Sequence, residues 1–100
     1  MSVERKKSKD TTTLSFTGEL SIYSVGELKG EILGDPESLG AQIALDLEQV
    51  SEIDTAGIQL LLFAKKHFLT QDKQLYLAKS NELVDSVFAT FDLQSAFAKG

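Results

Sequence analysis

A threonine stands between an acid and two small residues at the expected start of a helix, in the segment Asp54-Thr55-Ala56-Gly57. Asp54 is a favourable N-cap, because its carboxylate can accept hydrogen bonds from free backbone N–H groups and suits the positive end of the helix dipole. The Thr55 hydroxyl then lies near solvent, beyond the carboxyl end of a strand. Binding and chemistry in α/β proteins gather at that edge of the sheet, so Thr55 is the first candidate functional residue.

Few other side chains offer chemistry. The single histidine, His67, lies twelve residues further along the same helix. That is roughly 18 Å at a rise of about 1.5 Å per residue, so His67 cannot act as a base for Thr55. No phosphate-binding glycine loop, metal cluster or nucleophile elbow occurs in the sequence, and we expect no enzyme activity, no cofactor and no metal. The acidic residues near the strand end, which could hold Mg²⁺ but read more simply as solvated charges, are Asp46, Glu48, Glu52 and Asp54.

The helix that follows Asp54 is apolar on almost every side. At about 100° per residue, Leu60 and Phe63 fall opposite the natural core face, beside His67. Two interpretations stay open for this pair: it forms an exposed surface for a partner, or a neighbouring segment covers it. The predicted core face, with Lys65 inside its stripe, consists of Ile58, Leu61, Leu62, Phe68 and Leu69.

Gly57 costs a helix about 1 kcal/mol relative to alanine. This cost indicates that another chain or a neighbouring loop approaches closely at that position. We therefore expect a partner-binding surface around the start of the helix. Its candidate residues are Asp54, Thr55, Ala56, Gly57, Gln59, Leu60 and Phe63.

The positions of strands and helices follow from hydrophobic periodicity and capping residues. Helices separate the later strands, so part of the sheet should be parallel, whereas two short β segments at the start should pair antiparallel. We expect an α/β fold with a mixed sheet of about four strands and helices packed mainly on one face. The predicted strands are 11–17, 19–20, 42–47 and 74–79. The predicted helices are 22–33, capped by Ser21 or Ser24 and stopped at Gly34, then 55–69, and a third capped by Ser80 or Asn81. A short connection is expected over 48–53, and a short helix or a ragged end over 92–100.

Length, charge and cysteine content limit the class of protein. Residues 1–10 hold four basic and two acidic side chains, a net charge of +2, and we predict a flexible basic tail followed by one domain over residues 11–100. The other ninety residues carry six basic and thirteen acidic side chains, a net charge of −7, which argues against nucleic acid binding. The sequence has no cysteine and no apolar run longer than 60–64. Residues 1–10 contain no apolar stretch of the kind found in signal peptides, so we do not expect them to act as one. We expect a cytoplasmic protein that does not insert into membranes.

Three segments resemble the STAS domain, a family named for sulphate transporters and anti-sigma factor antagonists. They are Gly18-Glu19-Leu20, the strand at 43–47 and, above all, IDTAGIQLLL at 53–62. The family pattern in the last segment is Asp, Ser or Thr, a small residue, Gly, and then an aliphatic residue. The expected helix that runs from Asn81 into a Phe-Asp-Leu turn is similar too, so the resemblance covers about residues 11–97.

The resemblance implies regulation by partner switching. In anti-sigma factor antagonists, the hydroxyl residue after the Asp is phosphorylated by a serine/threonine kinase of the histidine-kinase-like ATPase fold, which is also the anti-sigma factor. The unphosphorylated antagonist binds this kinase and frees the sigma factor, and phosphorylation releases it; a phosphatase is a further expected partner. That position matches Thr55 here, while Ser21 stands where many members carry an aspartate close to the phosphorylation site.

A second reading of the same resemblance involves transport. STAS proteins similar to a cytoplasmic subunit of lipid-transport ABC complexes also carry Asp-Thr, a small residue and Gly, and there the domain binds a transporter ATPase without being phosphorylated. In a third reading, the domain is a degraded or purely structural module, and Thr55 only helps to cap the helix. The first reading agrees with electrostatics, because a phosphate suits a helix N-terminus yet adds roughly −2 charge next to Asp54 and would repel a docked partner.

Overall fold

A mixed β-sheet and three helices make up the fold in the computed structural model, which describes residues 2–34 and 39–99. The strands are β1 (Ser2–Ser8), β2 (Thr11–Leu20), β3 (Gln42–Ile53) and β4 (Gln74–Lys79), and the helices are α1 (Val25–Leu33), α2 (Thr55–Leu69) and α3 (Glu82–Thr90). The strand order is β1-β2-β3-β4, with β1 and β2 antiparallel and the other two pairs parallel. The predicted mixed four-stranded sheet is therefore confirmed.

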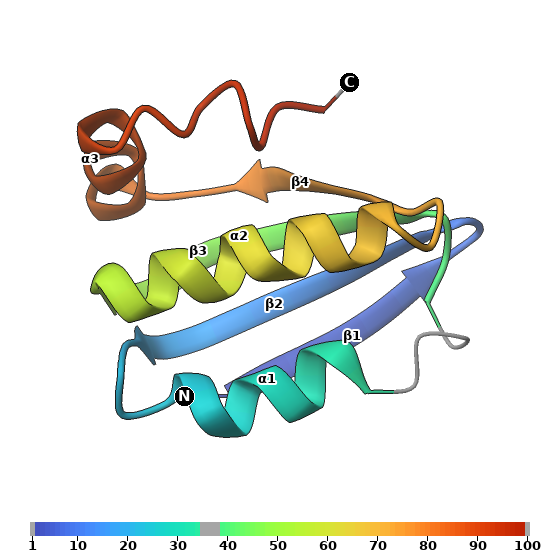
Figure 1. Ribbon diagram of the computed structural model, residues 1–100, viewed down its shortest axis with the longest axis horizontal. Coiled ribbons are helices and arrows are strands. Elements are labelled where there is room, and N and C mark those ends of the chain that lie inside the picture. Colours follow the sequence, from blue (N-terminus) through green and yellow to red (C-terminus); the bar gives the residue numbers. More distant parts are fainter. Residues whose placement is uncertain (1, 35–38, 100) are drawn as a thin grey trace.

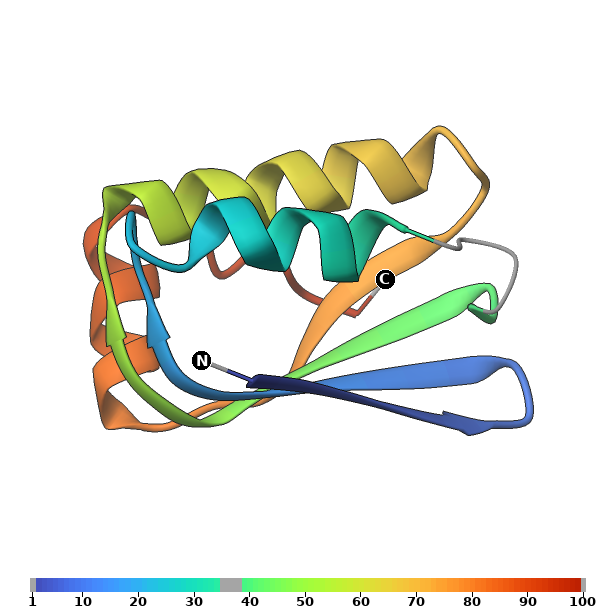
Figure 2. The same cartoon turned by 90° about the horizontal axis from the view of Figure 1, so that it is seen from below.

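The helices are arranged as two covering helices and one end helix. α1 and α2 lie side by side over one face of the sheet (Figure 2), whereas α3 stands at the end of the sheet where α2 begins (Figure 1). The connections β2–α1–β3 and β3–α2–β4 step across the sheet in the same direction, and right-handed crossovers then place both helices on the same face. The expected packing of helices mainly on one face is confirmed.

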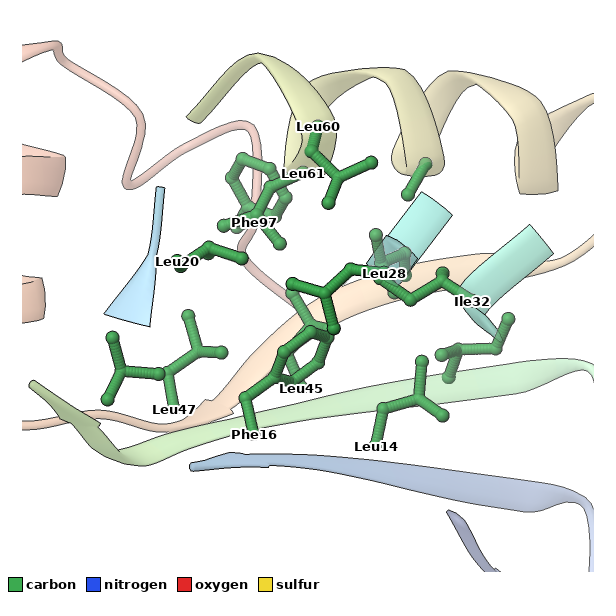
Figure 3. Packing of buried hydrophobic residues seen from close by; sticks show 14 of the residues in the cluster. Leu14, Phe16, Leu20, Leu28, Ile32, Leu45, Leu47, Leu60, Leu61 and Phe97 are labelled. Atoms are coloured by element: carbon green, nitrogen blue, oxygen red, sulfur yellow. The ribbon is translucent and has the colours of Figure 1, made fainter. Parts of the chain in front are cut away.

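The core lies between this face and the two covering helices (Figure 3). β2 alternates between buried and partly exposed residues over its first half, and this period of two is what predicted a strand with one buried face. Both covering helices and the C-terminal segment add side chains to the same cluster. Its members include Leu14, Phe16, Leu20, Leu28, Ile32, Leu45, Leu47, Leu60, Leu61 and Phe97.

The flexible tail predicted for residues 1–10 is wrong, because Ser2–Ser8 form the edge strand β1. The strand pairs antiparallel with β2 along its whole length, and a tight turn with Lys9 at φ 56° joins the two. Within β1 only Val3 is half-buried. An edge strand needs few apolar residues, and lysines on it oppose pairing with other chains. The charged sequence of β1 therefore did not predict a strand.

Arg5 ties β1 to the end of α1. Its guanidinium donates hydrogen bonds to the carbonyl oxygens of Glu31, Ile32 and Gly34, the last at 3.0 Å. Carbonyl groups in the last turn of a helix lack intrahelical partners and form the negative end of its dipole. The single arginine of the chain therefore caps α1, which ends before Gly34 as predicted.

β2 and β3 are both longer than predicted. Residues 11–17 and 19–20 form one strand rather than an antiparallel pair, and the antiparallel partner is β1. Residues 48–53 continue β3 instead of forming a connection to α2. The parallel pair therefore runs as far as Leu20 opposite Ile53, directly below the start of α2.

Two irregularities in β3 explain why its sequence did not predict this extension. β3 has one extra residue relative to β2 between the partners of Ser15 and Thr17, and another between the partners of Gly18 and Glu19. Gly18 has a φ of 106°, which residues with a side chain rarely adopt. Bulges bend a strand and interrupt its period of two, and here the two strands curl toward the N-terminal ends of α1 and α2 (Figure 2).

The three predicted helices are confirmed, with one shifted start. α3 follows Asn81, whose side-chain oxygen accepts a hydrogen bond from the Val84 N–H at 2.8 Å. α1 begins at Val25, after Ser24, the later of its two predicted caps. The Ser24 hydroxyl accepts a hydrogen bond from the Ser21 N–H at 3.1 Å, and residues 22–24 form a turn. No helix within 2–34 and 39–99 is long and apolar enough to cross a membrane.

The last residues form turns over 94–97 rather than the short helix or ragged end that was expected. Phe97 is buried, and its ring centroid lies 5.3 Å from that of Phe88 on α3. The Phe97 carbonyl also accepts a hydrogen bond from the Leu77 N–H at 2.8 Å. The C-terminal segment therefore covers the free edge of β4 and completes the core.

Replacing Arg5 by alanine should loosen β1 and the end of α1 together. We expect Arg5→Ala to lower the free energy of unfolding by about 1–3 kcal/mol, the usual range for hydrogen bonds from a charged group, as measured by urea denaturation. Lys6→Ala, an exposed position on the same strand, is the control and should change stability by less than about 0.5 kcal/mol. Equal losses in the two variants would contradict the capping role of Arg5.

Candidate functional site

The start of α2 is joined to the end of β2 and to the turn that follows it. The Asp54 N–H donates to the Leu20 carbonyl at 3.2 Å. The Asp54 carboxylate accepts one hydrogen bond from the Gly57 N–H at 3.0 Å, which confirms it as the N-cap, and another from the Ile22 N–H at 2.9 Å. One side chain therefore fixes both the first turn of α2 and the 21–24 turn.

These bonds also set the charge of the site. The Ile22 N–H, followed by the Gly57 N–H, lowers the pKa of the Asp54 carboxyl below its ordinary value of 3.8. Both donors stabilise the ionised form, because a carboxylate accepts hydrogen bonds more strongly than the neutral acid. A negative charge therefore stands beside Thr55 at neutral pH.

Thr55 is the first residue of α2, and its side chain is exposed, as the sequence predicted. It follows directly on the carboxyl end of β3. The nearest turn presents two further exposed side chains, Ile22 and Tyr23, the latter 92% exposed. The sequence did not reveal these two, because Ile22 fits the apolar stripe of a helix beginning at 22, and only the turn at 22–24 turns it outward.

Gly57 is required by the packing of its own chain. A Cβ placed on Gly57 would overlap the carbonyl group and the side chain of Leu20. Of the two close approaches that the sequence left open, the neighbouring segment is the one observed, and Gly57 itself is buried. Gly57 therefore positions Thr55 and is not itself an exposed contact residue.

Of the two interpretations left open for Leu60 and Phe63, cover by a neighbouring segment holds for Leu60, because only 6% of its surface is accessible and it belongs to the core. Leu60 is therefore not an exposed contact residue, as its place among the partner-binding candidates required. Phe63 is 46% exposed, as predicted. The predicted core residues Leu62 and Leu69 are exposed instead. The reason is that α1 packs against α2 on the side of Leu60 and covers it, whereas Leu69 lines an open groove with residues of the C-terminal segment.

A shallow groove between α1 and α2 begins beside Thr55. Phe63 marks its far end, where the Lys29 ammonium nitrogen lies 4.6 Å from the centroid of the Phe63 ring. The candidates Ala56, Gln59 and Phe63 therefore line one groove, and the buried Leu60 forms its floor. Thr55 does not line the groove and precedes Ala56 in the first turn of α2. The groove is lined by Ile22, Val25, Gly26, Lys29, Ala56, Gln59, Leu60 and Phe63.

The other candidates for chemistry lie away from Thr55. His67 stacks on Phe63, with 6.1 Å between ring centroids, and makes contact with Gln71 at the far end of α2. The Asp46 carboxylate accepts from the Glu48 N–H of its own strand at 3.1 Å. In the part of the chain that the structure describes, no group of acidic residues and histidine is arranged to hold a metal ion.

The sequence matches a known family over nearly its full length. The family model described as "Mlab, STAS domain" covers residues 3–97. The chain belongs to this STAS family. The match includes β1, so the edge strand is part of the STAS domain itself. Among curated proteins, none matches the sequence.

Solved structures share the fold of this STAS domain. The anti-sigma factor antagonist SpoIIAA in its unphosphorylated form has a TM-score of 0.77 at 19% identity, covering 94% of this chain and 84% of that one. Bacillus SpoIIAA in its phosphorylated form gives 0.72 at 17%, covering 96% and 87%. An anti-sigma factor antagonist from Mycobacterium paratuberculosis gives 0.82 at 14%, covering 96% and 81%. A sulfate transporter family protein from Wolinella succinogenes gives 0.76 at 18%, covering 89% and 72%.

Truncation of Leu60 and of Phe63 should have different effects on stability. Leu60→Ala removes buried methyl groups, and we expect it to lower the free energy of unfolding by about 2–4 kcal/mol. Phe63→Ala, the matched variant on the same helix, should cost less than about 1 kcal/mol because its ring is half exposed. Urea denaturation of both variants checks this, and similar losses would mean that Phe63 is as much a core residue as Leu60.

The lowered pKa of Asp54 predicts a pH-dependent contribution to stability. The ionised carboxylate stabilises the folded state, so its contribution is present above the unfolded pKa of about 3.9 and is lost as pH falls through the lower folded pKa. Asp54→Asn keeps an N-capping side chain but removes the charge. We expect its melting temperature to lie below that of the wild type at pH 7, and the difference to narrow at pH values near about 3.

The control for this comparison is Glu52→Gln, which removes one negative charge two residues earlier in the chain. This variant measures how the loss of one negative charge, at a position without the hydrogen bonds of Asp54, changes the dependence of the melting temperature on pH. A difference between wild type and Asp54→Asn that stays constant from neutral to acid pH would contradict a stabilising Asp54 carboxylate.

Proposed function

We propose that this STAS domain is a regulatory protein-binding domain of the anti-sigma factor antagonist type, and that phosphorylation of Thr55 controls which partner it holds. The observation that carries the proposal is the exposed Thr55 hydroxyl at the first turn of α2, bordered by exposed Ile22 and Tyr23 and by a groove that ends at Phe63. The proposed partners are an anti-sigma factor or related serine/threonine kinase of the histidine-kinase-like ATPase fold, and a phosphatase. Because such a kinase uses ATP, the proposal assigns the domain to the cytoplasm.

Phosphorylation of Thr55 would act by adding negative charge at the start of α2. A phosphate adds about −1.5 to −2 charge and three strong acceptor oxygens. Next to it, the ionised Asp54 carboxylate already occupies the Ile22 N–H and the Gly57 N–H. The phosphate would therefore be repelled by Asp54 and would compete with it for the same donors. A partner that rests on Ile22 and Tyr23 would meet both the added charge and a weakened 21–24 turn.

Structures with the same fold support this proposal. SpoIIAA is an anti-sigma factor antagonist that exists in an unphosphorylated and a phosphorylated form. The exposed position of Thr55 leaves its hydroxyl accessible to a kinase without any opening of the fold. Among the hydrogen bonds of the described residues, none involves the Thr55 side chain. No such bond would therefore have to break before a kinase transfers a phosphate to the Thr55 oxygen.

A second candidate function is favoured by the family description, which names Mlab. In this alternative, the domain is a cytoplasmic subunit of a lipid-transport ABC complex and binds the transporter ATPase. Thr55 would then serve as a binding hydroxyl that is never phosphorylated. The same surface, from Ile22 along the groove to Phe63, would be covered by the ATPase.

Incubation with the kinase encoded nearest to this gene and with ATP should add one phosphate, detected by intact mass spectrometry. Thr55→Ala should abolish the incorporation, whereas Ser51→Ala, an exposed hydroxyl residue close by, should leave it unchanged. We expect Thr55→Glu to weaken kinase binding by about 1–3 kcal/mol, because it places a charge on the interface, as measured by calorimetry.

The two candidate functions give different results. No phosphate on Thr55 with any kinase of the gene neighbourhood would remove the phosphorylation switch, and unchanged kinase affinity in Thr55→Glu would remove Thr55 from the interface. Copurification of the unmodified domain with a transporter ATPase, lost on Thr55→Glu and kept on Ser51→Ala, would support the transport subunit instead.

A further inference from the structure

A second groove lies at the other end of α2, away from Thr55. It runs between the C-terminal half of α2, the first residues of β4 and the C-terminal segment after α3, and it encloses about 280 Å³. Leu69, on its α2 wall, is fourteen residues from Thr55, which corresponds to about 21 Å along a helix. The residues that line it and carry the argument are Lys65, Leu69, Lys73, Tyr76 and Ala96.

Positive charge surrounds this groove. The Lys65 ammonium group donates to the Leu75 carbonyl at 3.4 Å. The Lys73 ammonium group donates to the carbonyl oxygens of Leu39 and Gly40, at 3.1 and 3.3 Å. Lys99 lies over the ring of Tyr76, with its ammonium nitrogen 5.3 Å from the ring centroid. Carbonyl groups and rings orient these cations but do not neutralise them. The chain as a whole carries a net charge of −5, so the sign of the charge at this groove is opposite to that of the whole molecule.

Exposed leucines adjoin the same cations. Leu62 and Leu69 are 38% and 61% exposed, and Lys65 lies between them on one stripe of α2. This spacing of three and four residues places all three side chains on the same side of the helix. An exposed apolar stripe next to charge is typical of a protein interaction surface. The stripe lies on the flank of α2 opposite Phe63, so it is separate from the groove beside Thr55.

We propose that this second groove binds an acidic, leucine-containing segment of another protein, independently of the surface around Thr55. Carboxylates of the segment would approach Lys65, Lys73 and Lys99, and its leucines would cover Leu62 and Leu69. Charge complementarity favours a negatively charged partner, since the same lysines would repel a basic segment. The domain would then hold two proteins at once, one at each end of α2.

The test is a titration of the ¹⁵N-labelled full chain with a capped hexapeptide of alternating glutamate and leucine, followed by NMR. We expect saturable shifts at the amides of Leu69, Gln74 and Ala96, with an affinity that falls as salt screens the lysines. Leu69→Asp should weaken binding at least about tenfold, because it replaces an apolar contact by a like charge. A matched peptide with lysine in place of glutamate should not bind.

Phe63→Asp is the control variant, since it adds the same charge to the opposite flank of α2, and it should keep the affinity of the wild type. Far-UV circular dichroism of both variants verifies that they are folded. The proposal is overturned by the absence of saturable shifts up to about 1 mM peptide, by equal binding of the lysine peptide, or by shifts centred on Ile22 and Thr55. Shifts that follow protein concentration without peptide would assign the groove to a second copy of the chain and also overturn it. None of these outcomes depends on a kinase, so they are distinct from a failure of the Thr55 proposal.

Discussion

The junction between the end of β2 and the start of α2 is the constraint on which the rest of the site depends. Gly57 has no Cβ, and a Cβ there would overlap the Leu20 carbonyl, so α2 can begin directly against the strand end. The same carbonyl accepts the Asp54 N–H, and the Asp54 carboxylate reaches the Ile22 N–H. The first turn of α2, the last residue of β2 and the turn before α1 are thereby held in one arrangement.

This arrangement gives the surface around Thr55 its rigidity. Sites on helix and strand ends are positioned more accurately than sites on long loops. Only one residue separates Thr55 from the end of β3. The side chains that border it, Ile22 and Tyr23, belong to a turn held by Asp54 and by the Ser24 hydroxyl. A change of charge at Thr55 therefore alters one small surface and one carboxylate, while the core, built from the face of the sheet below, keeps its packing.

The sequence predicted the parts of the fold that carry a regular period. α2, β4 and the capped start of α3 follow from apolar spacing and from Asp54 and Asn81. β1 could not be found in this way, because an edge strand buries little and its lysines resemble a solvated tail. The second half of β3 was missed because its two bulges break the alternation. Ile22 and Tyr23 were missed because hydrogen bonds of Ser21 and Ser24, rather than apolar spacing, decide where α1 begins.

The apolar character of α2 on nearly every side also has a structural explanation. A helical projection assumes one buried face, but α2 is covered on two, by the sheet below and by α1 along the Leu60 flank. Its remaining apolar residues fall into two separate exposed groups. Phe63 lies on the α1 side, next to Lys29, and Leu62 and Leu69 lie on the side of the C-terminal segment, next to Lys65. Exposed apolar stripes next to charge favour association with other proteins. Packing along two faces therefore accounts for the buried apolar residues of α2, and the two exposed groups are the surfaces on which the two proposed partners would rest.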